Sequence, residues 1–377
     1  MNHPFVRLAL LCITAILVMA VAASSTVASP PLPSQANVTS VQFDGEVLTV
    51  EVRGDYAYVG LDTGLVILDI TQPTHAIVKG MTTGRTITIA LSGDYAYTSG
   101  GGLLRVIDVS QPARPLKLSE SDAFGSIDDL AVYGDHVYLA SEMGFRIVDV
   151  SDPLAPVVVG AVPDRGELKG LDVAPDATTG RLYAYVVGYP VEVLTDVWVG
   201  GGLRVLDVTE PTNPQEVYPC SNADPCAQEF GPHDIRVQGQ FAYIANYRDS
   251  VAGAKGLTIY DLADPLHPVG VGAYPTHESS YHVTTSGNRT FFTTAYMPYP
   301  WQGDLLYSID VTDKAHPRSL AAQELDQNRT GGLAASQAKG CVFAAQQARG
   351  LKILCQATAD LTPPSLTYLP MLTRPAG

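Results

Sequence analysis

The chain has 377 residues, of which 46% are hydrophobic and 16% charged, so the sequence predicts a packed core rather than disorder. This length indicates two or three domains or one large repetitive fold. The formal net charge of −15, without any run of basic residues, argues against a nucleic-acid partner, because phosphate binding draws on clustered Lys and Arg. Nineteen Tyr, 34 Gly and 27 Pro favour an all-β chain with many turns.

The N-terminal segment has the pattern of a secretory signal peptide over residues 1–28. Arg7 supplies a positive charge, Leu8–Val21 an apolar stretch, and Ala22 the end of a small-residue cleavage site, with a second such site at Ala28. The alternative is an uncleaved membrane anchor, but the apolar stretch is short for a helix that spans a bilayer. We therefore expect a secreted or cell-surface protein that keeps no transmembrane segment after signal removal.

A strand–turn–strand phrase recurs through most of the chain. It reads GDYAYVGLDTGLVILDITQP from Gly54, GDYAYTSGGGLLRVIDVSQP from Gly93 and GDHVYLASEMGFRIVDVSDP from Gly134, and four less regular copies bring the count to seven. Alternating apolar residues predict half-buried strands, and the Gly-Asp pairs predict tight hairpins. Flanking apolar runs add two further strands to each copy. Seven repeats of four strands predict an all-β, seven-bladed β-propeller.

The ends of the repeat region predict how the ring closes. The seventh copy stops after its third strand, at Cys355, whereas an unassigned strand lies near residues 37–44. We expect this strand to complete the last blade beside residues 350–355, because an open or eight-bladed arrangement would leave it unpaired. The predicted propeller spans residues 37–356. A Pro-rich tail, residues 357–377, follows, and its apolar part is too short to span a membrane.

The phrases ILDITQP, VIDVSQP, IVDVSDP, VLDVTEP and IYDLADP resemble the LVIVD-repeat family of secreted β-propellers. The resemblance covers about residues 37–356 and departs from the pattern at VTDK, which lacks the proline. It implies the fold and an extracytoplasmic setting. It does not imply an activity, because the family is not tied to one.

The four cysteines that remain after signal removal suggest two disulfides in an oxidising compartment. Cys341 and Cys355 have the same separation as the first and last aspartates of the first three repeat hairpins, so we expect both pairs to face each other across a hairpin. Cys220 and Cys226 bracket a short loop and are expected to pair with each other. The alternative for them is a free thiol or metal pair, although the spacing fits neither CxxC nor a zinc finger.

The fourth, fifth and sixth copies lengthen the hairpin between their second and third strands. These insertions are consecutive around the ring and lie on the face that also carries the loops leading into the innermost strands. Aromatic insertions on one face of a repeat fold often mark its binding face, the alternative being extensions that pack on one another. The candidate ligand-binding residues are Tyr189, Trp198, Tyr247, Tyr296, Tyr299 and Trp301.

Three of the eight histidines belong to the same sector. His233 and His282 begin innermost strands near the channel mouth, and with His277, Asp234 and Glu278 they form a candidate site for a divalent transition metal such as Zn, Cu or Fe. A general base or simple hydrogen bonding to neighbouring loops are the other interpretations. His233 is one residue further from its repeat glycine than His282 is. Because adjacent strand residues face opposite ways, this offset argues against a shared site.

No catalytic residue can be assigned, because the chain contains no P-loop or HExxH motif and its many Ser and Asp residues single out no triad. The sequence therefore favours a binding or interaction module over an enzyme, using the face formed by the inserted loops. A metal-binding protein or metal-dependent enzyme is the alternative, and an architectural surface component would need no site. The expected partner is an extracellular protein, peptide or glycan of unknown identity.

Overall fold

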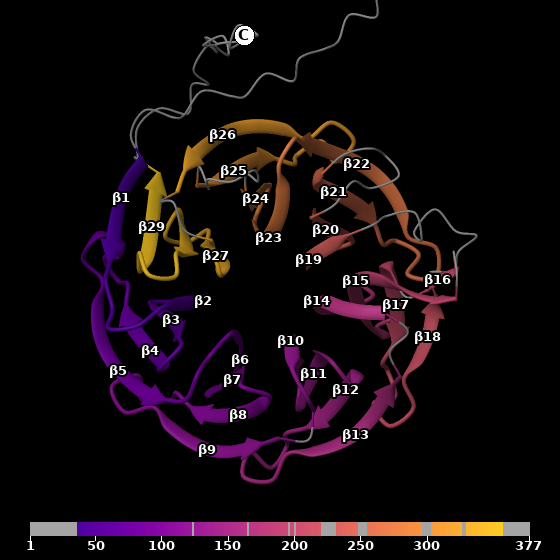
Figure 1. Ribbon diagram of the computed structural model, residues 1–377, viewed down its shortest axis with the longest axis horizontal. Coiled ribbons are helices and arrows are strands. Elements are labelled where there is room, and N and C mark those ends of the chain that lie inside the picture. Colours follow the sequence, from indigo (N-terminus) through magenta and orange to yellow (C-terminus); the bar gives the residue numbers. More distant parts are fainter. Residues whose placement is uncertain are drawn as a thin grey trace, which may run out of the picture. The chain divides into compact units, whose positions relative to one another are not determined.

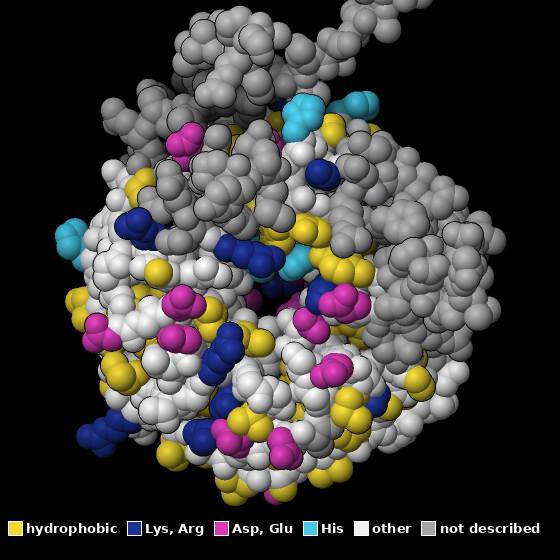
Figure 2. Space-filling model, in the orientation of Figure 1, with side chains coloured by type: hydrophobic (Ala, Val, Ile, Leu, Met, Phe, Trp, Pro, Cys, Tyr) yellow, Lys and Arg dark blue, Asp and Glu magenta, His cyan; other side chains and the backbone are white. Residues whose placement is uncertain are grey.

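Seven antiparallel sheets form a ring in the computed structural model (Figure 1), and the space-filling view shows an opening at its centre (Figure 2), so the expected seven-bladed β-propeller is confirmed. The structure describes residues 36–122, 124–163, 166–194, 197–199, 201–219, 231–247, 255–295, 303–325 and 329–356. The predicted signal peptide and the Pro-rich tail lie outside these residues. Within them, no helix is long and apolar enough to cross a membrane.

Each blade has four strands, which follow one another from the channel outwards. Blade 1 contains β2 (Val47–Arg53), β3 (Tyr56–Leu61), β4 (Gly64–Asp69) and β5 (Ile77–Thr83). Blade 2 contains β6 (Thr88–Ser92), β7 (Tyr95–Gly100), β8 (Leu103–Asp108) and β9 (Leu116–Ser121). Blade 3 contains β10 (Ile127–Tyr133), β11 (His136–Ser141), β12 (Gly144–Asp149) and β13 (Val157–Val162). Blade 4 contains β14 (Gly166–Pro175), β15 (Leu182–Leu194), β17 (Gly202–Asp207) and β18 (Gln215–Tyr218).

The remaining blades follow the same order. Blade 5 contains β19 (Pro232–Gln238), β20 (Phe241–Asn246), β21 (Lys255–Asp261) and β22 (Val269–Thr276). Blade 6 contains β23 (Ser279–Ser286), β24 (Arg289–Ala295), β25 (Asp304–Asp310) and β26 (Arg318–Glu324). Blade 7 contains β27 (Gly332–Ser336), β28 (Cys341–Ala345), β29 (Leu351–Gln356) and β1 (Ala36–Val41). Outside the blades, a short 3₁₀ helix, η1 (Pro73–His75), precedes β5, and β16 (Val197–Val199) extends blade 4 by pairing with β15.

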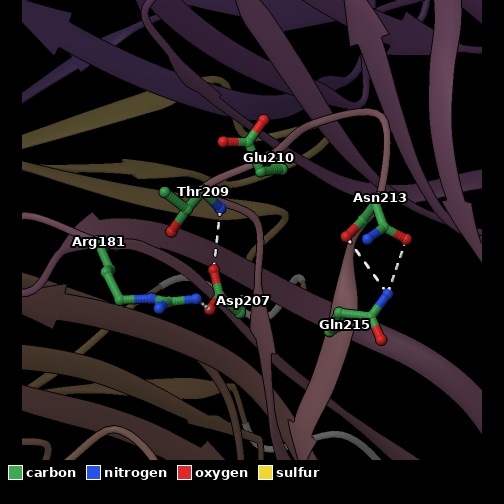
Figure 3. A pocket seen from close by; sticks show the side chains of 6 residues that line it. All are labelled: Arg181, Asp207, Thr209, Glu210, Asn213 and Gln215. Carbon is green, nitrogen blue, oxygen red and sulfur yellow. Dashed lines mark hydrogen bonds and ion pairs between the residues drawn. The ribbon is translucent and has the colours of Figure 1, made fainter.

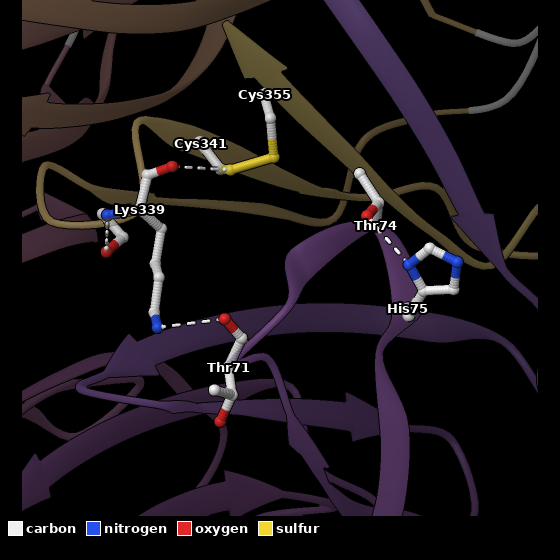
Figure 4. Close-up of a disulfide and its surroundings, with 7 residues drawn as sticks. Thr71, Thr74, His75, Lys339, Cys341 and Cys355 are labelled. Carbon is white, nitrogen blue, oxygen red and sulfur yellow. Dashed lines mark hydrogen bonds between the residues drawn. A yellow bond between two sulfur atoms is a disulfide. The ribbon is translucent and has the colours of Figure 1, made fainter. Parts of the chain in front are cut away.

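The ring closes as the sequence predicts. The N-terminal strand β1 pairs antiparallel with β29 along its whole length and so becomes the outermost strand of blade 7. Cys341 and Cys355 face each other across β28 and β29 and form a disulfide, with Cα atoms 4.1 Å apart (Figure 4). Lys339, just before β28, forms an ion pair with Asp55 of blade 1. The last blade is thus joined to both the N-terminal strand and the first blade.

The repeat hairpins differ from the expected register by one residue. Asp69 stands opposite Tyr56 and not opposite Asp55, so the prediction that the two aspartates face each other is wrong. Asp55 lies in the tight turn itself, directly after Gly54, whose φ of 60° requires glycine-like freedom. The strand begins only at Tyr56. Cys341 and Cys355 do face each other, although their separation equals that of Asp55 and Asp69. The reason is that the turn between β28 and β29 of blade 7 differs in length from the turn between β3 and β4.

The aspartate that ends the third strand stabilises the turn that follows, as the sequence predicts. In each of six blades its Oδ1 accepts the backbone N–H two residues further on, at 2.8–3.0 Å. Hydrogen bonds from Thr71 lower the pKa of Asp69 to about 2. The residues concerned are Asp69, Asp108, Asp149, Asp207, Asp261 and Asp310. These aspartates are turn residues and not catalytic carboxylates.

The core lies between neighbouring blades and not within any one of them. The second tyrosine of the YAY phrase is fully buried, as Tyr58 is at 2% exposure and Tyr138 at 1%. Tyr58 packs against Ile89 and Ile107 of the next blade, which shows how the face of one sheet covers the next. Each blade therefore depends on both neighbours for its buried surface, which holds the channel mouth rigid.

Candidate functional site

The channel mouth is the end at which the inserted hairpins begin. Each innermost strand pairs antiparallel with the second strand of its blade, so its first residues lie beside the end of that second strand. Figure 2 shows a central opening with histidine, basic and acidic side chains around and inside it. His233 and His282 lie at the starts of β19 and β23, as the sequence predicts.

Bulges bring the two histidines together. The ladder between β19 and β20, like that between β23 and β24, shifts register in the stretch that holds the histidine. A bulge adds an unpaired residue and re-aims the side chains around it, so counting from the repeat glycine no longer gives their direction. The ring centroids of His233 and His282 are 5.8 Å apart. The expectation that the offset keeps them apart is therefore wrong.

Three tyrosines complete the group around His233. Its ring centroid lies 5.2 Å from that of Tyr281 in β23 and 6.3 Å from that of Tyr189 in β15. Tyr247, directly after β20, lies 6.4 Å from His233 and 5.1 Å from Tyr281. Aromatic pairs at these distances attract each other beyond the effect of their buried area. Tyr189, His233, Tyr247, Tyr281 and His282 are termed the mouth cluster below.

A backbone carbonyl holds each histidine of the mouth cluster. Nδ1 of His233 lies 2.9 Å from the carbonyl oxygen of Tyr281, and Nε2 of His282 lies 3.1 Å from that of Thr330. Because a carbonyl oxygen only accepts, the ring nitrogen that contacts it must carry the proton and donate. The other nitrogens, Nε2 of His233 and Nδ1 of His282, are then unprotonated acceptors in the neutral rings.

Both imidazoles are neutral at physiological pH. Burial lowers the pKa of His233 to about 3, and the adjacent His282 adds to the shift. Burial likewise lowers the pKa of His282 to about 4, with the positive charges of Arg329 and Arg236 adding to it. The mouth cluster therefore presents aromatic surface and acceptor nitrogens at pH 7, and no positive charge of its own.

In the described part of the chain, two cations lie over tyrosine rings of the mouth cluster, and only the first of them is paired with carboxylates. Nζ of Lys169 is 5.6 Å from the ring centroid of Tyr189, and it pairs with Asp128 at 3.3 Å and with Glu167 at 2.5 Å. These ion pairs account for the lysine and for both carboxylates.

Arg329 is the other cation. Its guanidinium carbon lies 4.6 Å from the ring centroid of Tyr281, a cation–π distance, and the side chain is exposed. In the described part of the chain it forms no ion pair with a carboxylate. Among the described residues, Arg329 is therefore an exposed cation beside the mouth cluster that has no carboxylate in ion-pair contact.

Carboxylates deeper in the channel join neighbouring blades. In three successive blades an aspartate of the innermost strand accepts, through Oδ2, a backbone N–H of the next innermost strand. The pairs are Asp129 with Leu171 at 2.9 Å, Asp172 with Val237 at 2.7 Å and Asp234 with Val283 at 2.9 Å. Each aspartate also accepts the N–H of its own following residue through Oδ1. We term these three residues the inter-blade latches.

Arg236 lies among the latches. Its guanidinium donates to Oδ1 of Asp234 at 3.1 Å, while 29% of the side chain remains exposed to the channel. Burial raises the pKa of Asp129 to about 7, with Arg236 opposing the shift and Asp234 adding to it. Burial also raises the pKa of Asp172. The channel interior therefore holds an ionic network that links blades and in which raised pKa values reduce the charge of some carboxylates. Asp234 has a structural role in this network.

The proposed metal ligands do not assemble. No three His, Cys, Asp or Glu side chains of the described residues gather in a way that would hold a metal ion. Asp234 is engaged as a latch, His277 is exposed, and the backbone carbonyl of Glu278 accepts a hydroxyl hydrogen bond. Arg329 and Arg236, which both lower the pKa of His282, would also oppose a cation beside it.

Only part of the predicted aromatic face can be placed. Tyr189 and Tyr247 join the mouth cluster, with ring centroids 6.0 Å apart. The insertion of blade 4 forms a hairpin of β15 and β16, in which the backbone of Trp198 pairs with that of Glu192. The side chain of Trp198 lies outside the described residues. So do Tyr296, Tyr299, Trp301, Cys220 and Cys226 entirely, and their roles stay predictions.

Two residues of the site were missed by the sequence reasoning. Tyr281 directly precedes His282, so the sequence placed it in the same sector. The count from the repeat glycine gave no reason to expect that its ring would lie beside His233. Arg329 lies in the loop before β27, in a copy without an insertion. Only the ring arrangement, which sets blade 7 beside blade 6, brings it to the mouth.

A separate pocket lies on blade 4 at the opposite end of the ring. It has a volume of about 260 Å³ and is lined by Arg181, Asp207, Thr209, Glu210, Asn213 and Gln215 (Figure 3). Arg181 pairs with Asp207, whose other oxygen accepts the Thr209 N–H as part of the repeat turn. The Gln215 amide binds Asn213 Oδ1 at 2.9 Å. Its polar groups thus serve the turn that follows β17, and we assign it no ligand.

The fold and its repeats define the class of this protein, a seven-bladed β-propeller. The family model described as LVIVD repeat matches residues 44–84, 83–121, 124–164 and 232–276, which correspond to blades 1, 2, 3 and 5. Four of the seven blades therefore carry LVIVD repeats, and the resemblance drawn from the phrases is confirmed. No curated protein matches the chain.

Solved structures share the architecture at low sequence identity. The β-propeller domain of Cps50 (Swd1) from Myceliophteria thermophila aligns with a TM-score of 0.63 and 14% identity, covering 86% of this chain and all of that one. The WD40 β-propeller domain of Doa1 aligns with a TM-score of 0.61 and 9% identity, covering 87% of this chain and 98% of that one. At such identities the likeness shows the fold alone.

Proposed function

We propose that this chain is an extracytoplasmic binding module that takes its ligand at the channel mouth, on the face of the inserted hairpins. The observation that carries the proposal is the mouth cluster, in which rings from three blades lie with neighbouring centroids 5.1–6.4 Å apart. Four of its five side chains are partly exposed, the exception being Tyr281. Tyrosines with an apolar body and a polar tip are characteristic of binding surfaces.

The chemistry of the histidines supports binding over catalysis. A general base works best when its pKa lies near the operating pH. The pKa values of His233 and His282, about 3 and about 4, lie far below neutrality. Each ring is also fixed by a carbonyl, as suits a group that positions a ligand.

The extracytoplasmic part of the proposal is supported by the ends of the propeller. Residues 1–28 have the signal-peptide pattern, and the disulfide between Cys341 and Cys355 is of a kind that persists in oxidising compartments. Propellers host many unrelated functions, so the fold alone does not choose one. The site carries the proposal.

Purified mature protein tested on glycan and peptide arrays should retain a ligand, and Tyr247→Ala should weaken its binding about tenfold or more, as expected when a central aromatic contact is removed. Tyr133→Ala is the matched control, because Tyr133 is a 45% exposed tyrosine at the last residue of β10, on the opposite face. Equal loss in both variants, or no loss in either, would refute binding at the mouth.

A further inference from the structure

We propose that the ligand of the mouth cluster is an acidic carbohydrate, a sugar with a carboxylate and hydroxyl groups on adjacent carbons. This inference rests on the proposed function, because it names the ligand class for the same site. Three features of the mouth each match one part of such a ligand: acceptor nitrogens match hydroxyls, partly exposed tyrosines match the sugar ring, and a guanidinium without an ion pair to any described carboxylate matches the carboxylate.

The acceptor nitrogens select a ligand that donates hydrogen bonds. Because His233 and His282 each donate their N–H to a backbone carbonyl, Nε2 of His233 and Nδ1 of His282 can only accept hydrogen bonds. Oδ2 of Asp234, 3.9 Å from Nδ1 of His282, supplies no donor either, because it accepts the backbone N–H of Val283. Sugar hydroxyls on adjacent carbons present neighbouring donors, which suits two imidazoles whose rings lie 5.8 Å apart.

The partly exposed tyrosines suit the body of a sugar. Tyr189 and Tyr247 are both partly exposed, with centroids 6.0 Å apart and planes inclined by 31°. They form a shallow aromatic surface beside the acceptor nitrogens. A pyranose has one face made mainly of C–H groups, and contact of that face with tyrosine removes apolar area from water while the hydroxyls at its rim stay available.

The guanidinium of Arg329 selects a carboxylate. It is exposed, lies 4.6 Å from the centroid of Tyr281, and has no carboxylate partner among the described residues. A planar guanidinium binds a carboxylate through two parallel hydrogen bonds. Lys169, the other cation at the mouth, is already paired with Asp128 and Glu167. Since the whole chain carries a net charge of −15, an anion must be attracted locally, which makes Arg329 decisive.

Other ligand classes fit the same groups less well. An acidic peptide would satisfy Arg329, but its regular donors are backbone N–H groups, which do not lie on adjacent atoms as the hydroxyls of a sugar do. A transition metal would accept those lone pairs, but Arg329 and Arg236 oppose a cation beside His282. A neutral glycan would use the nitrogens and rings and leave the guanidinium without a partner.

The test is an array of uronate and sialate oligosaccharides, each beside its methyl ester, together with acidic peptides. We expect the acids to bind about tenfold tighter than their esters, as loss of one charge-assisted bidentate contact implies. Arg329→Gln should abolish this preference, and His282→Gln should weaken acid and ester alike. Arg53→Gln is the matched control, because Arg53 lies over Tyr58 at 5.8 Å at the other end of an innermost strand, and it should change neither.

The outcomes separate the inference from the proposed function. Retention of acidic peptides with no acidic glycan, or equal binding of acid and ester, overturns the carbohydrate inference and leaves the binding module standing. Stoichiometric zinc, copper or iron that disappears in His282→Gln also overturns it. Acidic-glycan binding that survives Tyr247→Ala overturns the proposed site itself. An array that retains nothing overturns both.

Discussion

At the scale of single residues, the mouth cluster depends on hydrogen bonds that set which nitrogen of each histidine is protonated. In His233 and His282 one ring nitrogen donates to a backbone carbonyl, and the other is left as an unprotonated acceptor. The inter-blade latches behave differently. Asp129, Asp172 and Asp234 use both carboxylate oxygens on backbone N–H groups, so these three channel carboxylates are structural.

The neutral histidines predict a loss of stability in mild acid. The unfolded chain takes up protons near pH 6.5, whereas His233 and His282 in the folded state do so only near pH 3 and 4. Stability present above pH 6.5 is therefore lost as the pH falls, by about 2 kcal/mol per histidine between pH 7.5 and pH 5. The variants His233→Gln and His282→Gln should each lose about 2 kcal/mol less stability than wild type between pH 7.5 and pH 5. Urea unfolding measures this difference.

Comparing each variant with wild type cancels the contributions of the other titrating groups to the pH dependence. Asp129, whose pKa is raised to about 7, acts in the opposite sense, because its protonated form favours the folded state, but it is present in all variants. His267→Gln, in a turn where the side chain is 78% exposed, should follow the wild-type pH dependence. Parallel curves for wild type and both mouth variants would mean that these histidines are not neutral in the folded protein.

At the scale of elements, two features determine the site and the fold. The bulges in β19 and β23 set the directions of the mouth histidines, and the pairing of β1 with β29 closes the ring. Repeat phrases predicted which segments are strands, because alternation and turn residues are local signals. They did not predict the bulges, since one extra residue in a ladder leaves no local mark. The directions expected for His233 and His282 consequently rested on a count that the bulges invalidate.

The disulfide at the ring closure predicts a second stability effect. Cys341→Ser with Cys355→Ser removes a cross-link that spans 14 residues, which should lower the free energy of unfolding by about 3 kcal/mol. Urea unfolding of the variant and of wild type, each with and without reductant, measures the difference. Reductant should affect wild type more strongly than the variant. If the two proteins unfold at the same urea concentration without reductant, blade 7 is held by β1 alone.

At the scale of the whole molecule, the sequence predicted the architecture better than the site. Seven similar phrases and an unassigned N-terminal strand were enough for a closed ring, because each blade repeats the same local pattern. The site depends on which blades become neighbours and on how their loops meet, so no sequence pattern indicated Arg329 of blade 7. The insertion aromatics beyond Tyr189 and Tyr247 lie outside the described residues and remain a prediction.

Ligand binding at the mouth is the central claim, and nitrogen NMR of histidine rings tests it most directly. Protein with ¹⁵N-labelled histidine would be titrated with the compound that the array retains most tightly. We expect saturable shifts at Nε2 of His233 and Nδ1 of His282, the two acceptor nitrogens, while His267 and His316 in exposed turns stay unchanged. Saturable binding that leaves both mouth histidines unchanged would contradict the account.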